Sequence, residues 1–176
     1  GSQGSPFQTR DWQTNFNFRL KALETPERIA DSLEGRLKER ILIHDGFYDY
    51  LNNNTDRETK GKEQRYKQIM DEVESLMKDE EGYSFYVTGH SLGGALANVF
   101  AFQVAGEGPK YDFIPRPVTV ITYAAPFSGT RGYRKAYEQM ELNGLIRNLR
   151  IVVDKDFVPT LFPTSILDRF RTMKHC

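Results

Sequence analysis

A serine lies between two glycines in the segment Gly89-His90-Ser91-Leu92-Gly93. The residues before it, 83–87, alternate in a β-rich run, and those after it place apolar side chains at helical spacing. Strand, sharp turn and helix in this order lift a serine hydroxyl above the edge of a sheet, with the positive end of the helix behind it. We expect Gly89 and Gly93 where strand and helix come too close for a side chain. The chemistry that such a serine performs is nucleophilic attack.

This arrangement is the nucleophile elbow of an α/β-hydrolase, and it predicts Ser91 as the nucleophile. The backbone N–H of Leu92, at the start of the helix, is the expected first donor of the oxyanion hole. A glycine-rich turn that binds phosphate, as in a dinucleotide fold, is the alternative, but its glycines follow a different spacing.

Elements that could position this serine alternate along the chain. Extended segments are expected at 41–43, 118–123 and 149–153, and helices at 62–78 and 133–140. Alternating strands and helices predict an α/β fold, with a mostly parallel sheet and helices on both faces. Functional groups then gather at the carboxyl ends of the strands.

Two carboxylates follow the strand expected at 149–153. A triad needs an acid at the carboxyl end of a later strand, where it orients the base imidazole and stabilises the imidazolium. Asp154 and Asp156 both stand there, and both could also be ordinary solvated loop acids.

The chain offers three histidines as candidates for the base. His90 adjoins the nucleophile and is expected to pack behind it, and His44 lies upstream although the order in this fold is nucleophile, acid, histidine. His175 has the right order but follows Asp156 closely. The order of residues leaves the choice open between His175 and a base beyond Cys176.

Four segments together resemble a known family. Residues 87–97, V-T-G-H-S-L-G-G-A-L-A, look like the elbow of the class 3 lipases, the fungal triacylglycerol lipase type. Residues 1–3 and 11–16 resemble the family's R-G-S strand end and tryptophan-bearing lid, 44–47 its H-x-G-F, and 156–159 its D-x-V-P. The similarity runs over nearly the whole chain. It departs at 125–129, A-P-F-S-G, where the family more often has G-x-P-R-V-G.

The resemblance selects Asp156 as the acid and Ser2 as the second oxyanion donor. It also implies a base beyond Cys176, with His175 as the alternative. It implies a lid at about residues 5–20, with Trp12 and Phe16 on its apolar face, that opens at a lipid–water interface. It also implies that residues 1–176 form a single lipase-like domain, the central part of a larger lipase domain truncated at both ends.

The function implied is hydrolysis of acylglycerol esters through an acyl-serine intermediate. A phospholipase A1 or galactolipase on the same scaffold is the nearest alternative, and a non-catalytic domain that binds a lipid or a protein is a more distant one.

The composition of the chain argues against several classes of binding partner. Twenty-four acidic and twenty-four basic residues leave no net charge, which gives no electrostatic case for nucleic acid. No cluster has metal-ligand spacing, so no metal or cofactor is expected, and no apolar run is long enough for a transmembrane helix.

Overall fold

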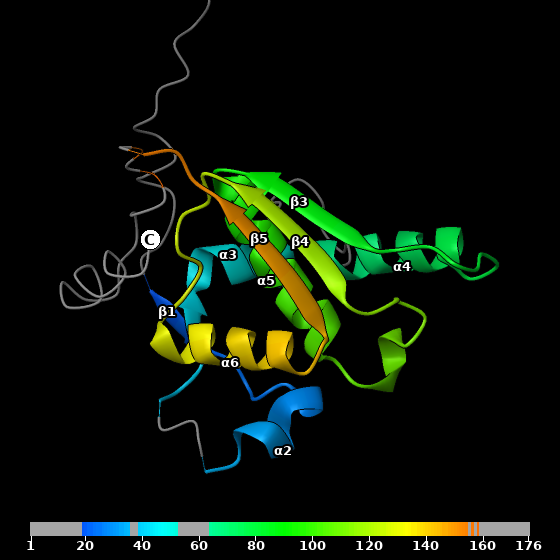
Figure 1. Cartoon of the computed structure of the whole chain (residues 1–176), viewed down its shortest axis with the longest axis horizontal. Coiled ribbons are helices and arrows are strands. Elements are labelled where there is room, and N and C mark those ends of the chain that lie inside the picture. Colours follow the sequence, from blue (N-terminus) through cyan, green and yellow to red (C-terminus); the bar gives the residue numbers. More distant parts are fainter. Residues whose placement is uncertain (1–18, 36–38, 53–63, 155, 157, 159–176) are drawn as a thin grey trace, which may run out of the picture.

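A three-stranded parallel sheet is at the centre of the fold. The computed structural model describes residues 19–35, 39–52, 64–154, 156 and 158 (Figure 1). The strands, in their spatial order, are β3 (Tyr86–His90), β4 (Val118–Tyr123) and β5 (Ile146–Ile151). Since both pairs are parallel, the carboxyl ends of all three strands lie at one edge of the sheet.

Helices connect the strands, and two of them, α5 and α6, pack against the main sheet. The helices are α2 (Ala30–Leu33), α3 (Asp45–Asn52), α4 (Arg65–Met77), α5 (Leu92–Gly106) and α6 (Arg131–Leu142), with short 3-10 turns at Glu27–Ile29 and Pro109–Tyr111. Helix α5 links β3 to β4 and lies behind the sheet in Figure 1, and α6 links β4 to β5. The predicted parallel sheet with connecting helices is confirmed.

A second, two-stranded sheet flanks the first. Its antiparallel strands are β1 (Leu20–Ala22) and β2 (Leu42–His44). Ile43 forms a β-bridge with Gly129, so this small sheet is attached to the loop that follows β4.

Helix α5 is buried on nearly all sides. Eleven of its fifteen residues are buried, where the sequence predicted an apolar face only. The reason is its position, because β3 and β4, α3 and α6 all contact it. A helix in such a central place can be apolar all round.

Polar side chains tie α5 to its helical neighbours. The Tyr133 hydroxyl of α6 donates to the Asn98 carbonyl at 3.2 Å, and the Tyr137 hydroxyl donates to Asn98 Oδ1 at 3.4 Å. On the other side, Asn52 of α3 and Gln103 exchange two amide hydrogen bonds of 3.2 and 3.1 Å. These bonds satisfy polar groups that would be costly to leave unpaired in the interior.

The two faces of the main sheet differ. Val118 and Val120 are fully buried on the face that α5 covers. Tyr86 and Leu149, on the alternate positions, are 62% and 54% exposed. Among the described residues, the helices therefore cover one face of the sheet and leave an apolar face open, whereas the sequence predicted helices on both faces.

Some element boundaries differ from the sequence prediction. The strand expected at 149–153 begins earlier, at Ile146, because that residue pairs with Val118. It ends at Ile151, so Val152 and Val153 lie outside it. The strand expected at 118–123 is confirmed as predicted.

Candidate active site

Ser91 is the single residue between β3 and α5. Its φ of 52° and ψ of −124° put a non-glycine residue in a sparsely populated region, which costs of the order of 1–3 kcal/mol. Its N–H donates to the Tyr123 carbonyl at 2.8 Å, and its own carbonyl accepts from the Gly94 N–H at 2.9 Å. The surrounding backbone therefore holds the serine in a strained turn at the carboxyl edge of the sheet.

Two glycines allow strand and helix to meet at this turn. A β-carbon on Gly89 would overlap the backbone of Gly93, and one on Gly94 would come within 2.7 Å of the Ala125 β-carbon. The prediction for Gly89 is thus confirmed, and the prediction for Gly93 is wrong. A β-carbon on exposed Gly93 would meet nothing within 4 Å, because this residue contributes its backbone to the contact and would direct a side chain outward.

The N-terminus of α5 begins directly after the serine. Leu92 is its first residue and is half-buried. The first N–H groups of a helix have no intrahelical acceptor and carry the positive end of the helix dipole. An oxyanion that forms beside Ser91 would meet this positive end.

Asp156 lies beyond the carboxyl end of β5. Its N–H donates to the Val153 carbonyl at 3.2 Å, and its Oδ1 accepts from the Val158 N–H at 2.9 Å. The side chain is thereby held in a turn and is half-buried, whereas that of Asp154 is exposed. Since β4 separates β3 from β5, the ends of these two strands lie about 10 Å apart.

The two histidines that the structure describes, His90 and His44, differ in their surroundings. His90, the last residue of β3, is exposed rather than packed, because the alternation of the strand places it on the open face of the sheet. His44 is buried at the end of β2, and its ring meets that of Phe47 edge to face at 6.0 Å. Ser2, Trp12, Phe16 and His175 lie outside the described residues.

The loop at 124–129, which in the sequence stood out only as a departure from the family pattern, adjoins the serine turn. Ala124, directly after β4, has a φ of 50°, and its N–H donates to the Ile151 carbonyl at 2.8 Å. Arg150 Nη2 donates to the Ala125 carbonyl at 2.9 Å, and its guanidinium lies 5.1 Å from the centre of the Phe127 ring. An arginine within an otherwise apolar strand end is a signal that could have pointed to this loop; nothing in the sequence marks the positive φ of Ala124.

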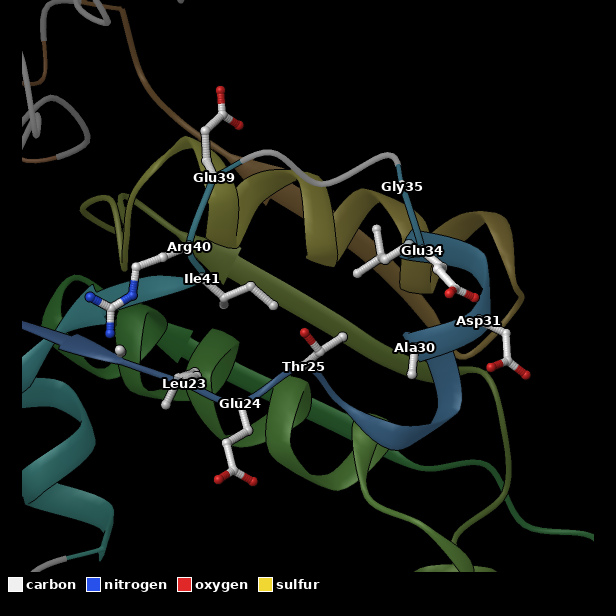
Figure 2. A pocket seen from close by; sticks show the side chains of 12 residues that line it. Leu23, Glu24, Thr25, Ala30, Asp31, Glu34, Gly35, Glu39, Arg40 and Ile41 are labelled. Atoms are coloured by element: carbon white, nitrogen blue, oxygen red, sulfur yellow. The ribbon is translucent and has the colours of Figure 1, made fainter.

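An open hollow lies apart from this edge of the sheet. It encloses about 870 Å³ between the chain that follows β1, helix α2 and the chain that enters β2 (Figure 2). Its lining includes four carboxylates, Glu24, Asp31, Glu34 and Glu39, and the cation Arg40, and neither Ser91 nor Asp156 is part of it. In the part of the chain that the structure describes, no three His, Cys, Asp or Glu side chains are grouped as a metal site would need. None of the described helices has the length and apolarity to cross a membrane.

Comparison with known proteins identifies relatives. A family model described as "Lipase (class 3)" matches residues 1–166. The galactolipase DONGLE, chloroplastic, from Arabidopsis thaliana is 27% identical, over 93% of this chain and 33% of its own length. Phospholipase A1-II 6 from Oryza sativa subsp. japonica is 32% identical, over 74% of this chain and 34% of its own length. The chain thus spans about a third of the length of these curated relatives.

Solved structures share the fold. Lipase II from Rhizopus niveus superposes with a TM-score of 0.59 at 21% identity, over 89% of this chain and 48% of that one. M37 lipase gives a TM-score of 0.64 at 18% identity, over 98% of this chain and 48% of that one. The predicted α/β-hydrolase fold is confirmed by these neighbours.

Proposed function

This chain belongs to the class 3 lipase family, and on that premise we propose that it hydrolyses carboxylic esters of lipids through a serine nucleophile. One observation carries the proposal. Ser91 occupies a strained turn between the carboxyl end of β3 and the N-terminus of α5, which is the geometry that an acyl-transfer nucleophile needs.

In the first half-reaction Ser91 Oγ attacks the ester carbonyl carbon, and a histidine takes the proton of the hydroxyl. The tetrahedral intermediate then collapses, the alcohol leaves with that proton, and the acyl group stays on the serine. Water, activated by the same histidine, releases the fatty acid. The base in this proposal is a histidine beyond Cys176, with His175 as the alternative.

Asp156 is the proposed acid of the triad. It follows β5, and the carboxyl ends of β5 and β3 lie about 10 Å apart, which leaves room for an imidazole between the segments that carry the acid and the nucleophile. The hydrogen bond from the Val158 N–H to Oδ1 supports this role, because it holds the carboxylate in one orientation. In exposed Asp154 we see a loop residue.

Leu92 and Ser2 are the proposed oxyanion donors. The N–H of Leu92 is free of intrahelical bonds by its position at the start of α5. Ser2 comes from the resemblance to the family's R-G-S segment. Loss of one such donor typically costs about 2.7–4 kcal/mol of transition-state stabilisation.

Acylglycerols are the proposed substrate class, taken up at a lipid–water interface that Trp12 and Phe16 of the lid contact. A second candidate is a diacyl lipid with a polar head group. The names of the curated relatives, a galactolipase and a phospholipase A1, favour it. Release of fatty acid from triolein, phosphatidylcholine and galactolipid, compared at equal surface area, separates the two.

The decisive variant is Ser91→Ala in the longest natural polypeptide that carries this sequence. Fatty-acid release should fall to background, and a fluorophosphonate should no longer add mass to the protein. Ser84→Ala is the matched control, since Ser84 is exposed and precedes β3. Undiminished hydrolysis by Ser91→Ala would refute the proposal, and a folded wild-type protein without any hydrolysis would favour a lipid-binding or protein-binding domain.

A further inference from the structure

We infer that Arg150 is a positioning residue, which holds the loop 124–129 against β5 and so sets the spacing between Ser91 and Asp156. The inference rests on the proposed function. It concerns a side chain that does not touch the reacting atoms and acts through the two backbone segments that carry them.

Arg150 makes two contacts with the 124–129 loop. Its Nη2 donates to the carbonyl of Ala125, a fully buried residue, at 2.9 Å. Its guanidinium also lies over the Phe127 ring, 5.1 Å from the ring centre. A planar guanidinium can donate along its edge and stack on its face at once, which an ammonium group cannot do.

The loop in turn presses on the serine turn. The Ala125 β-carbon faces Gly94 so closely that a methyl group on Gly94 would lie 2.7 Å from it. The Gly94 N–H donates to the Ser91 carbonyl at 2.9 Å. Continuous contact therefore runs from Arg150 through Ala125 and Gly94 to Ser91.

A second connection runs along β5 toward the acid. The Ile151 carbonyl, next to Arg150, accepts the Ala124 N–H at 2.8 Å, and the chain then continues to Asp156. Arg150 thus stands where the loop beside the nucleophile meets the strand that leads to the acid. If the Arg150 guanidinium is removed, the Ala125 carbonyl loses a charged donor, and the loop and strand can shift relative to each other.

Such a shift should affect turnover more than lipid binding. A misplacement of about 1 Å between catalytic groups can cost as much as about 100-fold in rate. It should also lower the pKa of the base, because a more distant Asp156 carboxylate stabilises the imidazolium less. The acid limb of the kcat/KM profile then moves to lower pH.

The test compares Arg150→Met, which keeps the apolar stem, with Arg150→Lys, which keeps the charge, in the longest natural polypeptide that contains this sequence. Arg147→Met is the matched control, since Arg147 lies on the same strand, is exposed and points to the opposite face. Rates are expressed per serine titrated with a fluorophosphonate. Arg150→Met should lower kcat about 10-fold with KM little changed and shift the acid limb, with partial recovery in Arg150→Lys and no effect in Arg147→Met.

An unchanged kcat per titrated serine, with only a lower melting temperature, would overturn the inference, and so would a change confined to KM. If the wild-type protein neither hydrolyses lipids nor reacts with the phosphonate, the proposed function fails and hydrogen exchange decides this inference instead. The Ser91 and Ala124 amides should then exchange faster in Arg150→Met but not in Arg147→Met. Equal exchange in all three proteins would refute the positioning role.

Discussion

The Ser91 N–H donates to the carbonyl of Tyr123, and the next amide along β4, that of Ala124, donates to the carbonyl of Ile151, each at 2.8 Å. Hydrogen bonding between the strands thus continues one residue beyond each strand, to Ser91 after β3 and to Ala124 after β4. Both of these residues have positive φ, 52° for Ser91 and 50° for Ala124. Two neighbouring strands are therefore each followed by a residue of positive φ, at the edge of the sheet where Asp156 follows the third strand.

Ala124→Gly should stabilise the fold. An alanine in the left-handed region is strained, and glycine removes that strain at a smaller cost in chain entropy, so a gain of up to about 1 kcal/mol is expected. The midpoint of urea denaturation measures it. Ala97→Gly, within α5, is the control and should lose about 1 kcal/mol or more. Equal losses in the two variants would show that Ala124 is not strained.

Gly89→Ala and Gly93→Ala should behave oppositely, although both glycines flank the serine. A methyl group on Gly89 overlaps the Gly93 backbone, which cannot yield without opening the turn, so a loss of more than about 3 kcal/mol is expected. A methyl group on Gly93 meets open space within a helix, where alanine is favoured over glycine. Thermal melts of the two variants decide, and a severe loss in Gly93→Ala would contradict the geometry.

Asp156→Asn should lower kcat by about 10⁴-fold, because an amide no longer stabilises the imidazolium. Its oxygen can still accept the Val158 N–H, so the turn and the melting temperature should persist. Initial rates of ester hydrolysis measure the effect. Asp154→Asn, with an exposed side chain, serves as the comparison and should leave kcat little changed. The reverse outcome would transfer the acid role to Asp154.

Tyr133→Phe should flatten the loss of stability at alkaline pH. Burial raises the pKa of Tyr133 well above its ordinary value, so above about pH 10 the unfolded chain loses a proton that the folded chain keeps. The free energy of unfolding must then fall as pH rises, by about 1.4 kcal/mol per pH unit for this group. Tyr133→Phe has no phenol to titrate, so its free energy of unfolding should fall less as the pH rises. At neutral pH the variant should be less stable by about 1 kcal/mol, because the hydrogen bond to Asn98 is lost.

Urea titrations between pH 8 and 11 measure the slope. Tyr86→Phe is the control, because the Tyr86 side chain is 62% exposed in the folded protein. Parallel stability curves for the wild type and Tyr133→Phe would contradict the prediction.

Much of the fold is legible in local patterns. The β-rich run at 118–123 became β4 without change, because β-branched and aromatic residues favour an extended backbone and its alternate residues, among them Val118 and Val120, point into the core. The serine turn was equally clear, since a strand, a glycine two residues before the serine and a helix after it all agree. The start of β5 at Ile146 could not be predicted from the local sequence, because residues 146–148 become part of the strand through the pairing of Ile146 with Val118.

The rest of the site depends on tertiary contacts that leave no local pattern. Nothing near Ala124 distinguishes it from an alanine in an ordinary loop, and its hydrogen bond to Ile151 joins it to a strand that lies far along the chain. Gly93 resembles Gly94 in sequence, and only the approach of Ala125 shows which of them has no room for a side chain. The contact of Arg150 with the 124–129 loop likewise joins residues about twenty-five positions apart.

The burial of α5 has a consequence for synthesis on the ribosome. This helix is apolar on nearly every side, yet β4 and α6, which cover it, are made after it. A nascent chain that has emerged only as far as η2 (Pro109–Tyr111) therefore displays an uncovered hydrophobic segment. We expect the chain to bind chaperones during this interval of translation. The interval ends once α6 has emerged and its tyrosines can reach Asn98.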